Sequence, residues 1–550
     1  MVLKSYERLR QQLFRREFLV CLTQFGRGVW GSDFGSVGFV FQKAPPKGRR
    51  GSYRKLFERH VDVRSNTKIE ALFRDRNYNA FTVSQDDYSA IPGSPLAYWL
   101  DQAVMGNYKT GRLLGDIAYP RKGMDTGDNG EFLRMWWEVS RTRLATIGED
   151  DRKWLPYNKG GGFRRWYGNR AVVVNWDSDG AAIRARLSWP SRTPTLRNQE
   201  FMKREGFSWG TVSSGGFSAR YSPWGALFDN GGCTLFADRD LEHLGALLNS
   251  STADLYLDFL APTLNFQPGD VAKIPIPQGF GTLKLESRRC IEISKNDWDS
   301  REESFDFKRL RLVTLAPLLR DAAEMEFKVG CALTMELQDL EEFNNRAIAS
   351  AYNLAGIVST QVAPEKVSLS CNPAYRFGGG SNRDQWGSRM TRELTAELVS
   401  YAVGCTFGRY SLDEHGLILA DQGATLQDYL TKVPTPSFTP DADNVVPIVD
   451  GDWFEDDIVG RFRQFLRIAF GDKYFEENLN FVAESLGVKN LREYFITKAG
   501  KSKFYDDHVQ RVQEASDLLA VLKSQGIVQR PDLPTPLHAV DRLNSADVPA

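Results

Sequence analysis

The sequence has few histidines and cysteines, and none of them is spaced as a metal site requires. Its 550 residues include 5 His and 6 Cys. No two cysteines form a C-x-x-C pair and no two histidines are three or four residues apart, which are the spacings that gather ligands around zinc. We therefore expect no metal site, and we expect the cysteines to be reduced core residues.

Long apolar runs and an apolar leader are also missing. No stretch approaches the roughly 18 consecutive apolar residues that a membrane-spanning helix needs. Met1 is followed at once by a charged, helix-like segment rather than by a signal peptide. These two absences predict a cytoplasmic protein.

Charge is unevenly distributed, although the formal net charge is zero. Residues 141–220 hold 15 Lys and Arg against 7 Asp and Glu, whereas residues 441–480 hold 4 against 10. Clustered basic side chains are what phosphate contacts need, so the middle of the chain is a candidate polyanion-binding face. An ordinary solvated surface is the alternative for the basic region. The acidic stretch 441–480, which has helical spacing, could instead bind a partner protein.

Apolar periodicity and turn residues predict an α/β protein, α+β overall, with several domains. Residues 6–20 have helical spacing, and Leu19–Phe25 and Val37–Lys43 have the pattern of two buried strands around a glycine-rich turn. The predicted regions are 1–98, mixed α/β; 99–285, mainly β with glycine-rich turns; 286–364, a helical linker or spacer; and 365–550, mixed and largely helical, with a sequence that diverges after about residue 510 and ends in a proline-punctuated tail, 529–550.

A tetrapeptide near the beginning of the last region resembles a catalytic motif. Adenine methyltransferases hold a flipped base with an Asn-Pro-Pro-Tyr type sequence, in which Asn accepts hydrogen bonds from the amino group and the aromatic ring stacks. Asn372, Pro373, Ala374 and Tyr375 differ from it at one position. Asn-Pro also opens ordinary turns. We therefore assign no catalytic residue and keep Asn372, Pro373 and Tyr375 as weak candidates.

Two glycine-rich segments are candidates for the turn that binds the methyl donor in methyltransferases. Gly26–Gly35 follows a strand-like run but lacks the G-x-G-x-x-G spacing. Gly404–Gly408 would need a strand before it, and the preceding residues have helical spacing. We expect structural turns at both places and no cofactor-binding residue.

The segment 152–170 is the strongest candidate for contact with DNA. It combines basic, aromatic and glycine residues, and such side chains can neutralise phosphates, pair with base edges and stack. A basic hairpin with core aromatics is an equally ordinary interpretation. With flanking positions, the predicted DNA-binding residues are Lys122, Lys153, Tyr157, Lys159, Arg164, Arg165, Trp166, Asn169, Arg170 and Arg220.

Several longer segments resemble the PglX family of adenine-specific DNA methyltransferases from bacterial BREX phage-defence systems. They follow the family's order across most of the chain. They include SYERLRQQLF (5–14), FGRGVWGSDFGSVGFVF (25–41), KGMDTGDNGEFLRMWWEV (122–139), KWLPYNKGGGFRRWYGN (153–169), RYSPWGALFDNGG (220–232), LAPTLNFQPGDVAKIPIP (260–277), NPAYRFGGG (372–380) and SYAVGCTFGRYSLDEHGLILADQG (400–423).

The resemblance implies a division of roles. Family members methylate adenine N6 with S-adenosylmethionine and act with other BREX proteins. By this likeness, residues 1–98 are the C-terminal part of a Rossmann-like methyltransferase domain and 99–285 a DNA target recognition domain. The family's donor-binding turn and Asn-Pro-Pro-Tyr lie upstream of the segment that resembles 5–14.

We therefore expect a chain that reads double-stranded DNA and needs a partner chain carrying the catalytic half. It should not bind S-adenosylmethionine alone. A self-contained permuted methyltransferase using Asn372–Tyr375, and a non-catalytic interaction module or decayed fragment, are the alternatives.

Overall fold

The computed structural model describes residues 6–32, 34–58, 62–89, 91–145, 151–188, 193–261, 264–378, 385–421, 423–448, 454 and 456–515. The protein is mixed α/β, with 45% of residues in helices and 15% in strands distributed over several small sheets. This agrees with the fold class expected from the sequence. The predicted tail, 529–550, lies outside the described residues.

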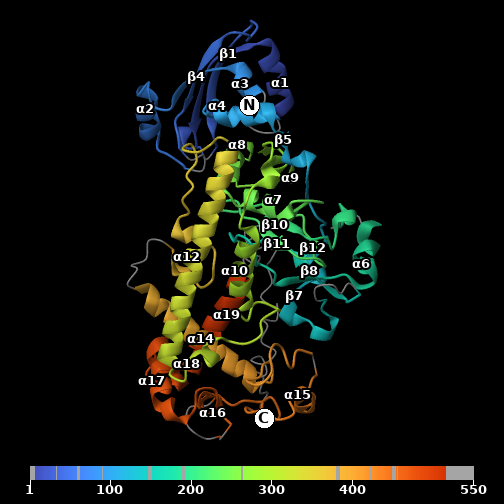
Figure 1. The fold of residues 1–550 in the computed structure, drawn as a ribbon, viewed down its shortest axis with the longest axis vertical. Helices are drawn as coiled ribbons and strands as arrows, with labels where there is room; N and C mark the ends of the chain where they lie inside the picture. Colours follow the sequence, from blue (N-terminus) through green and yellow to red (C-terminus); the bar gives the residue numbers. More distant parts are fainter. Residues whose placement is uncertain are drawn as a thin grey trace.

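The N-terminal module is a four-stranded sheet with short helices, at the top of Figure 1. The strand order is β2-β1-β3-β4, with β1 antiparallel to β2 and parallel to β3, and β3 antiparallel to β4. Its elements are α1 (Glu7–Arg16), β1 (Phe18–Gly26), η2 (Val29–Gly31), β2 (Ser36–Gln42), β3 (Arg50–Lys55), α2 (Asn66–Arg74), β4 (Ala80–Ser84) and α3 (Gln85–Ser89).

A buried glutamine fixes the change from helix to strand at residue 17. The Gln85 side-chain amide donates to Phe14 O at 2.8 Å and to Glu17 O at 3.0 Å, and its Oε1 accepts from Leu19 N at 2.9 Å. These bonds satisfy the carbonyls that α1 leaves open at its end. The helix therefore stops before residue 20, where the sequence pattern alone extends it.

The middle of the chain contains two four-stranded sheets, with orders β11-β10-β13-β6 and β12-β8-β9-β7. We expected this region to be mainly β, but its strands are short and it has more residues in helices than in strands, so it is mixed. The elements are α4 (Gln102–Thr110), β5 (Arg112–Leu113), η3 (Leu114–Asp116), β6 (Tyr119–Arg121), α5 (Asn129–Phe132), β7 (Leu133–Met135), η4 (Trp136–Glu138), η5 (Arg141–Arg143), β8 (Trp154–Asn158), β9 (Val172–Asn175), α6 (Asp177–Arg184), η6 (Ala185–Ser188), η7 (Gln199–Phe201), β10 (Gly206–Gly210), β11 (Arg220–Ser222), β12 (Leu227–Phe228) and β13 (Gly232–Phe236).

Two helices follow β13. Ser250 lies between them, and its hydroxyl accepts from Ala253 N at 3.1 Å, which caps the second helix. The elements are α7 (Leu241–Leu248), α8 (Ser251–Leu260), α9 (Pro268–Val271), β14 (Pro275–Ile276), which pairs with β5, and η8 (Phe280–Thr282).

The rest of the described chain is helical, as expected. It comprises α10 (Ser287–Asp299), α11 (Leu312–Leu315), α12 (Leu319–Ala351), η9 (Pro364–Lys366), α13 (Pro373–Phe377), α14 (Trp386–Thr406), α15 (Leu426–Lys432), α16 (Ile458–Phe470), η11 (Asp472–Tyr474), α17 (Phe475–Leu486), α18 (Leu491–Phe495) and α19 (Lys503–Ala515). No helix in the described ranges combines the length and the hydrophobicity needed to cross a bilayer.

Two large hydrophobic cores share the long helix α12, which runs down the left of Figure 1. Leu337 and Ile348 of this helix belong to the core that also contains the N-terminal module and the sheet β11-β10-β13-β6. Leu319 and Ala322 belong to the second core, formed by the C-terminal helices. Residues 286–364 therefore do more than link the flanking regions, because they contribute side chains to both hydrophobic cores.

Candidate nucleic-acid interface

The predicted DNA-binding segment leaves β8, passes through a glycine loop and returns as β9. Gly160 and Gly161 have φ of 101° and 105°, which side chains rarely adopt. A Cβ at Gly161 would lie 2.8 Å from the Asn169 amide nitrogen. This close turn brings residues 164–170 back across the domain and directs several of them inward.

Arg164 lies in the interior with a buried carboxylate. Its Nη2 donates to Asp297 Oδ2 at 2.7 Å, and Nη1 donates to Ser370 Oγ at 3.0 Å. The Arg164 and Asp297 side chains are 5% and 2% exposed. Asp297 also accepts from the backbone N–H groups of Ser370 and Cys371 at 2.7 and 2.9 Å. The arginine thus connects the β region to α10 and to the segment before α13.

The electrostatics of Asp297 fit a closed ion pair. Burial by itself would raise the pKa of Asp297, but the guanidinium groups of Arg164 and Arg301 outweigh it and lower the pKa. The carboxylate is therefore charged and paired at neutral pH.

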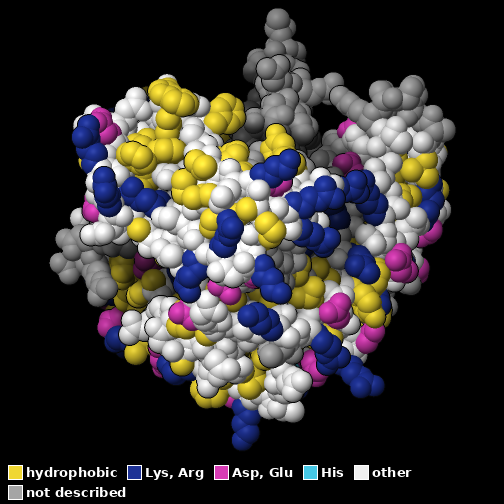
Figure 2. Space-filling view, turned by 90° about the horizontal axis from the view of Figure 1, so that it is seen from above, with side chains coloured by type: hydrophobic (Ala, Val, Ile, Leu, Met, Phe, Trp, Pro, Cys, Tyr) yellow, Lys and Arg dark blue, Asp and Glu magenta, His cyan; other side chains and the backbone are white. Residues whose placement is uncertain are grey.

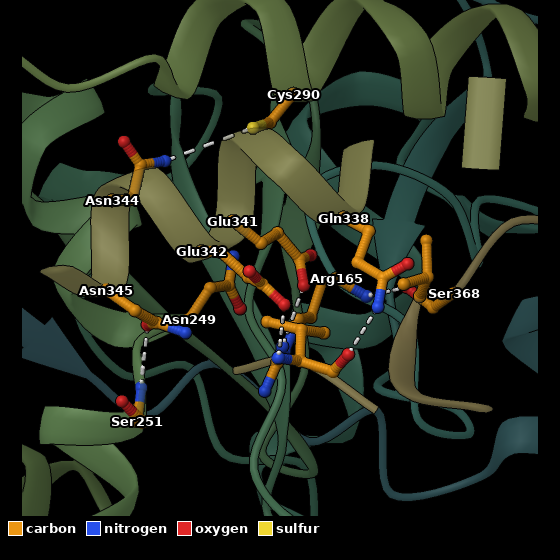
Figure 3. Close-up of polar contacts among 12 residues, drawn as sticks. Arg165, Asn249, Ser251, Cys290, Gln338, Glu341, Glu342, Asn344, Asn345 and Ser368 are labelled. Carbon is orange, nitrogen blue, oxygen red and sulfur yellow. Dashed lines mark hydrogen bonds and ion pairs between the residues drawn. The ribbon is translucent and has the colours of Figure 1, made fainter. Parts of the chain in front are cut away.

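Arg165 makes an equivalent connection to the middle of α12 (Figure 3). Its Nη1 donates to Glu341 Oε2 at 3.0 Å, and Trp166 Nε1 donates to Glu341 Oε1 at 2.7 Å. The Arg165 backbone N–H donates to Ser368 Oγ at 2.8 Å. Burial raises the pKa of Glu341, while Arg165 counteracts the rise. Both carboxylate oxygens are occupied within the chain.

The other two predicted arginines are also buried. Arg170 Nη1 donates to the Tyr167 hydroxyl at 2.6 Å, and its guanidinium carbon lies 5.3 Å from the centre of the Phe305 ring. Arg220 Nη2 donates to Gly160 O at 3.1 Å, and burial lowers the pKa of Arg220 to about 10. Arg220 thus satisfies the carbonyls of the glycine loop.

Lys159 and Tyr157 share one acceptor below the loop. Lys159 Nζ lies 2.6 Å from Asp229 Oδ2, and the Tyr157 hydroxyl donates to the same oxygen at 2.7 Å. The Lys159 side chain is 14% exposed, and burial, followed by Asp229, raises the pKa of Tyr157.

The structure therefore gives most of the predicted residues a different role from the one we expected. Arg164, Arg165, Arg170 and Arg220 are each no more than 6% exposed, so in this conformation they bind the chain's own carboxylates, hydroxyl and carbonyls rather than phosphates. The predicted residues that remain partly exposed, apart from Lys159, are Lys122, Lys153 and Asn169.

Neighbouring basic residues that the sequence did not single out lie close to Lys153. Arg152 Nη1 donates to Thr142 O at 2.8 Å, which places residues 152–153 beside the exposed Arg143. A cleft of about 470 Å³ lies next to this turn; its lining includes Arg141, Lys308 and His415. Lys308 comes from a loop 155 positions after Lys153, so no local sequence signal could connect them.

The catalytic-looking tetrapeptide serves as a helix cap. Asn372 Oδ1 accepts from Ala374 N at 3.0 Å, and Nδ2 donates to Pro364 O and Val367 O at 2.8 and 2.7 Å. Asn372 is 2% exposed, and the Tyr375 hydroxyl donates to Phe163 O at 2.5 Å. The amide and the phenol are both used internally, which leaves no donor or acceptor set for a flipped base.

Neither glycine-rich segment has the geometry of a donor-binding turn. Gly404 lies inside α14, so the segment 404–408 follows a helix and not the strand that such a turn requires. At Gly28, a Cβ would lie 1.9 Å from Arg64 O, so its neighbour's backbone fills the space beside it. Among the residues that the structure describes, no group of three or more His, Cys, Asp or Glu could hold a metal ion.

Comparison with known proteins finds two relatives, both named as adenine-specific methyltransferases. The chain is 32% identical over 528 residues to "Adenine-specific methyltransferase BrxX" of Escherichia coli O9:H4 (strain HS), which covers 93% of this chain and 42% of the relative. It is 32% identical over 546 residues to "Adenine-specific methyltransferase PglX" of Lacticaseibacillus casei (strain Zhang), covering 94% and 43%. No family model matches the chain.

The class that these relatives define is that of adenine-specific methyltransferases. Because the likeness extends over nearly all of the chain at this identity, the chain belongs to the PglX family, which includes BrxX. The chain spans less than half the length of the curated relatives that it matches.

Proposed function

We propose that this chain is the DNA-reading portion of a BREX phage-defence adenine-specific N6 methyltransferase, and that methyl transfer from S-adenosylmethionine needs a separate donor-binding portion. The observation that carries the proposal is the 32% identity to two adenine-specific methyltransferases over 93% and 94% of the chain.

The sequence itself supports the need for a second portion. Its only Pro-Pro pair is Pro45-Pro46, which is preceded by Ala44 and followed by Lys47. No Asn-Pro-Pro-Tyr type tetrapeptide is therefore present in these 550 residues. The nearest match, at Asn372, is internally bonded as a helix cap. In this proposal, residues 1–98 are the end of a Rossmann-like methyltransferase domain, and residues 99–285 are the target recognition domain.

DNA contact is assigned to the exposed and partly exposed basic side chains near the cleft. Arg143 and Lys153 lie on adjacent segments of the β region, and Lys308 lines the cleft next to them. Arg141 and Lys308 line this cleft from separate segments, and cations grouped in this way suit a phosphate backbone, which carries one charge per roughly 1.7 Å of duplex axis. Lys122 and Asn169 remain candidates for further contacts, and the buried arginines hold the scaffold.

The salt dependence of duplex binding tests this surface. Replacing both Arg143 and Lys153 with alanine removes two phosphate contacts, so the slope of log K against log salt should fall in magnitude by about 2. The matched control replaces Lys328 and Arg346 on α12, whose side chains are 70% and 57% exposed. An unchanged slope in the first variant, or an equal decrease in the control, would contradict the assignment.

Methyl transfer gives the second test. The purified chain with labelled S-adenosylmethionine should leave duplex DNA unmethylated. Transfer of label to adenine by this chain alone would overturn the proposal and favour the self-contained enzyme.

A further inference from the structure

The second strand of the N-terminal module, β2, has the apolar sequence of a buried strand, but it lies at the exposed edge of its sheet. The pattern Val-Gly-Phe-Val-Phe predicts burial, yet Phe39 is 47% exposed and Val40 53% exposed. Adjacent residues in a strand point to opposite faces of the sheet. Apolar side chains are thus uncovered on both faces, whereas strands that are apolar on both faces are ordinarily covered on both.

Among the residues that the structure describes, the outer edge of β2 carries neither of the side chains that usually block pairing, Lys and Pro. Within the described residues β2 pairs only with β1. Residues 36–42 contain no charged side chain and no proline, although natural edge strands are usually blocked by Lys, Pro or a covering segment. Such an edge can accept another strand through its open N–H and C=O groups.

Exposed apolar side chains are concentrated in the N-terminal module, to which this strand belongs. Of the 21 large hydrophobic side chains that are exposed in the described part of the chain, nine lie between Tyr6 and Phe73. Trp30 and Phe34, in the turn before β2, are 87% and 81% exposed. Figure 2, which looks onto this end of the molecule, shows hydrophobic side chains among Lys and Arg, with few acidic ones beside them. An apolar patch of this kind on a soluble protein marks an interaction surface.

We propose that the open edge of β2 pairs with a strand of the donor-binding portion of the methyltransferase, so that two polypeptide portions complete one sheet. This inference rests on the proposed function and adds the place of assembly. The partner should present an unpaired strand, apolar side chains for both faces, and acidic groups, because the exposed Lys43, Lys47, Arg49 and Arg50 follow β2 directly.

Two other occupants explain the surface less well. A second copy of this chain would pair its own β2, which is equally uncovered, so Phe39 and Val40 would remain open to water. DNA could contact the basic residues that follow β2, but it would leave the apolar side chains of Phe39 and Val40 uncovered, and β2 itself carries no cation. The donor-binding portion accounts for both faces, and more than half of each relative's length has no counterpart in this chain.

The test mixes this chain with the portion of the E. coli BrxX methyltransferase that the chain does not match. Light scattering should show a one-to-one complex. Val40→Lys places a charge against the apolar partner and should weaken binding roughly 30-fold or more. The control is Val445→Lys, since Val445 is also 53% exposed and lies in the C-terminal region; it should bind as the wild type does.

Hydrogen exchange identifies the surface directly. Amides of β2 that do not bond to β1 should become protected only in the complex. The proposal fails if the Val40→Lys variant binds as tightly as the wild type, if these amides stay unprotected in the complex, or if they are protected by a second copy or by duplex DNA instead. The Val40→Lys chain should keep its DNA affinity and salt slope, so failure of this assembly and failure of DNA reading give different results.

Discussion

Replacing Arg165 with alanine removes the cation from a carboxylate that water does not reach. The Glu341 side chain is 2% exposed, and after the change it keeps the hydrogen bond from Trp166 Nε1 at 2.7 Å. Breaking a buried ion pair on one side costs about 3–5 kcal/mol, because the other charge stays buried and uncompensated. We expect the free energy of unfolding to fall by that amount.

The loss should depend on pH in a defined direction. Burial already raises the pKa of Glu341, and Arg165 is the first influence that opposes the rise. Without Arg165 the pKa rises further, so the folded state binds a proton where the unfolded state has lost it. Stability then falls as pH increases between the unfolded and the folded pKa. The deficit of the variant should therefore be smaller at about pH 5 than at about pH 8.

Guanidinium unfolding followed by tryptophan fluorescence measures the effect. As a control, Arg288→Ala breaks an exposed pair with Glu242, whose side chains are 77% and 42% exposed, and should cost at most about 1 kcal/mol. Replacing Arg165 with Met and Glu341 with Leu together should recover most of the loss. A loss below about 1 kcal/mol for Arg165→Ala, together with weaker DNA binding, would refute the structural role and restore the phosphate-contact interpretation.

Two further predictions concern other buried polar groups. Asn372→Ala removes three hydrogen bonds and leaves the buried Val367 carbonyl and the partly buried Pro364 carbonyl without this donor, so the free energy of unfolding should fall by about 2–3 kcal/mol; a thermal melt that does not change would contradict the cap role. The pKa of Asp297 is lowered in the folded state, so its contribution to stability is present above the unfolded pKa and is lost as pH falls through the folded pKa. Urea titrations from about pH 7 to about pH 3 should show this loss in the wild type and a flatter dependence in Asp297→Asn, and parallel curves would contradict it.

Local patterns predicted much of the secondary structure. Helical spacing identified α1 and α14, and apolar runs on either side of a glycine-rich turn identified β1 and β2. These patterns depend on residues that are close in the sequence, so a single chain reveals them. The end of α1 was missed because it is fixed by Gln85, which lies 68 residues beyond Glu17.

The site was harder to predict, because the sequence shows cations but not their partners. Asp297 and Glu341 lie 133 and 176 residues from the arginines that they bind. Composition alone cannot distinguish an arginine that awaits a phosphate from one that is neutralised by a distant carboxylate. The exposure of β2 could not be predicted for a related reason. An apolar strand sequence suggests burial, but it does not show whether other segments of the chain cover the strand.

Because α12 is shared by both hydrophobic cores, it should determine how the protein responds to proteolytic cleavage and to unfolding. Its 33 residues form a rod of about 50 Å, and both ends are sealed into hydrophobic interiors. Cleaving the chain just before or just after α12 would separate one hydrophobic core from the helix residues that complete it. Neither fragment should therefore fold stably on its own. A substitution that destabilises one core should also destabilise the other, and the two cores should unfold in a single cooperative transition.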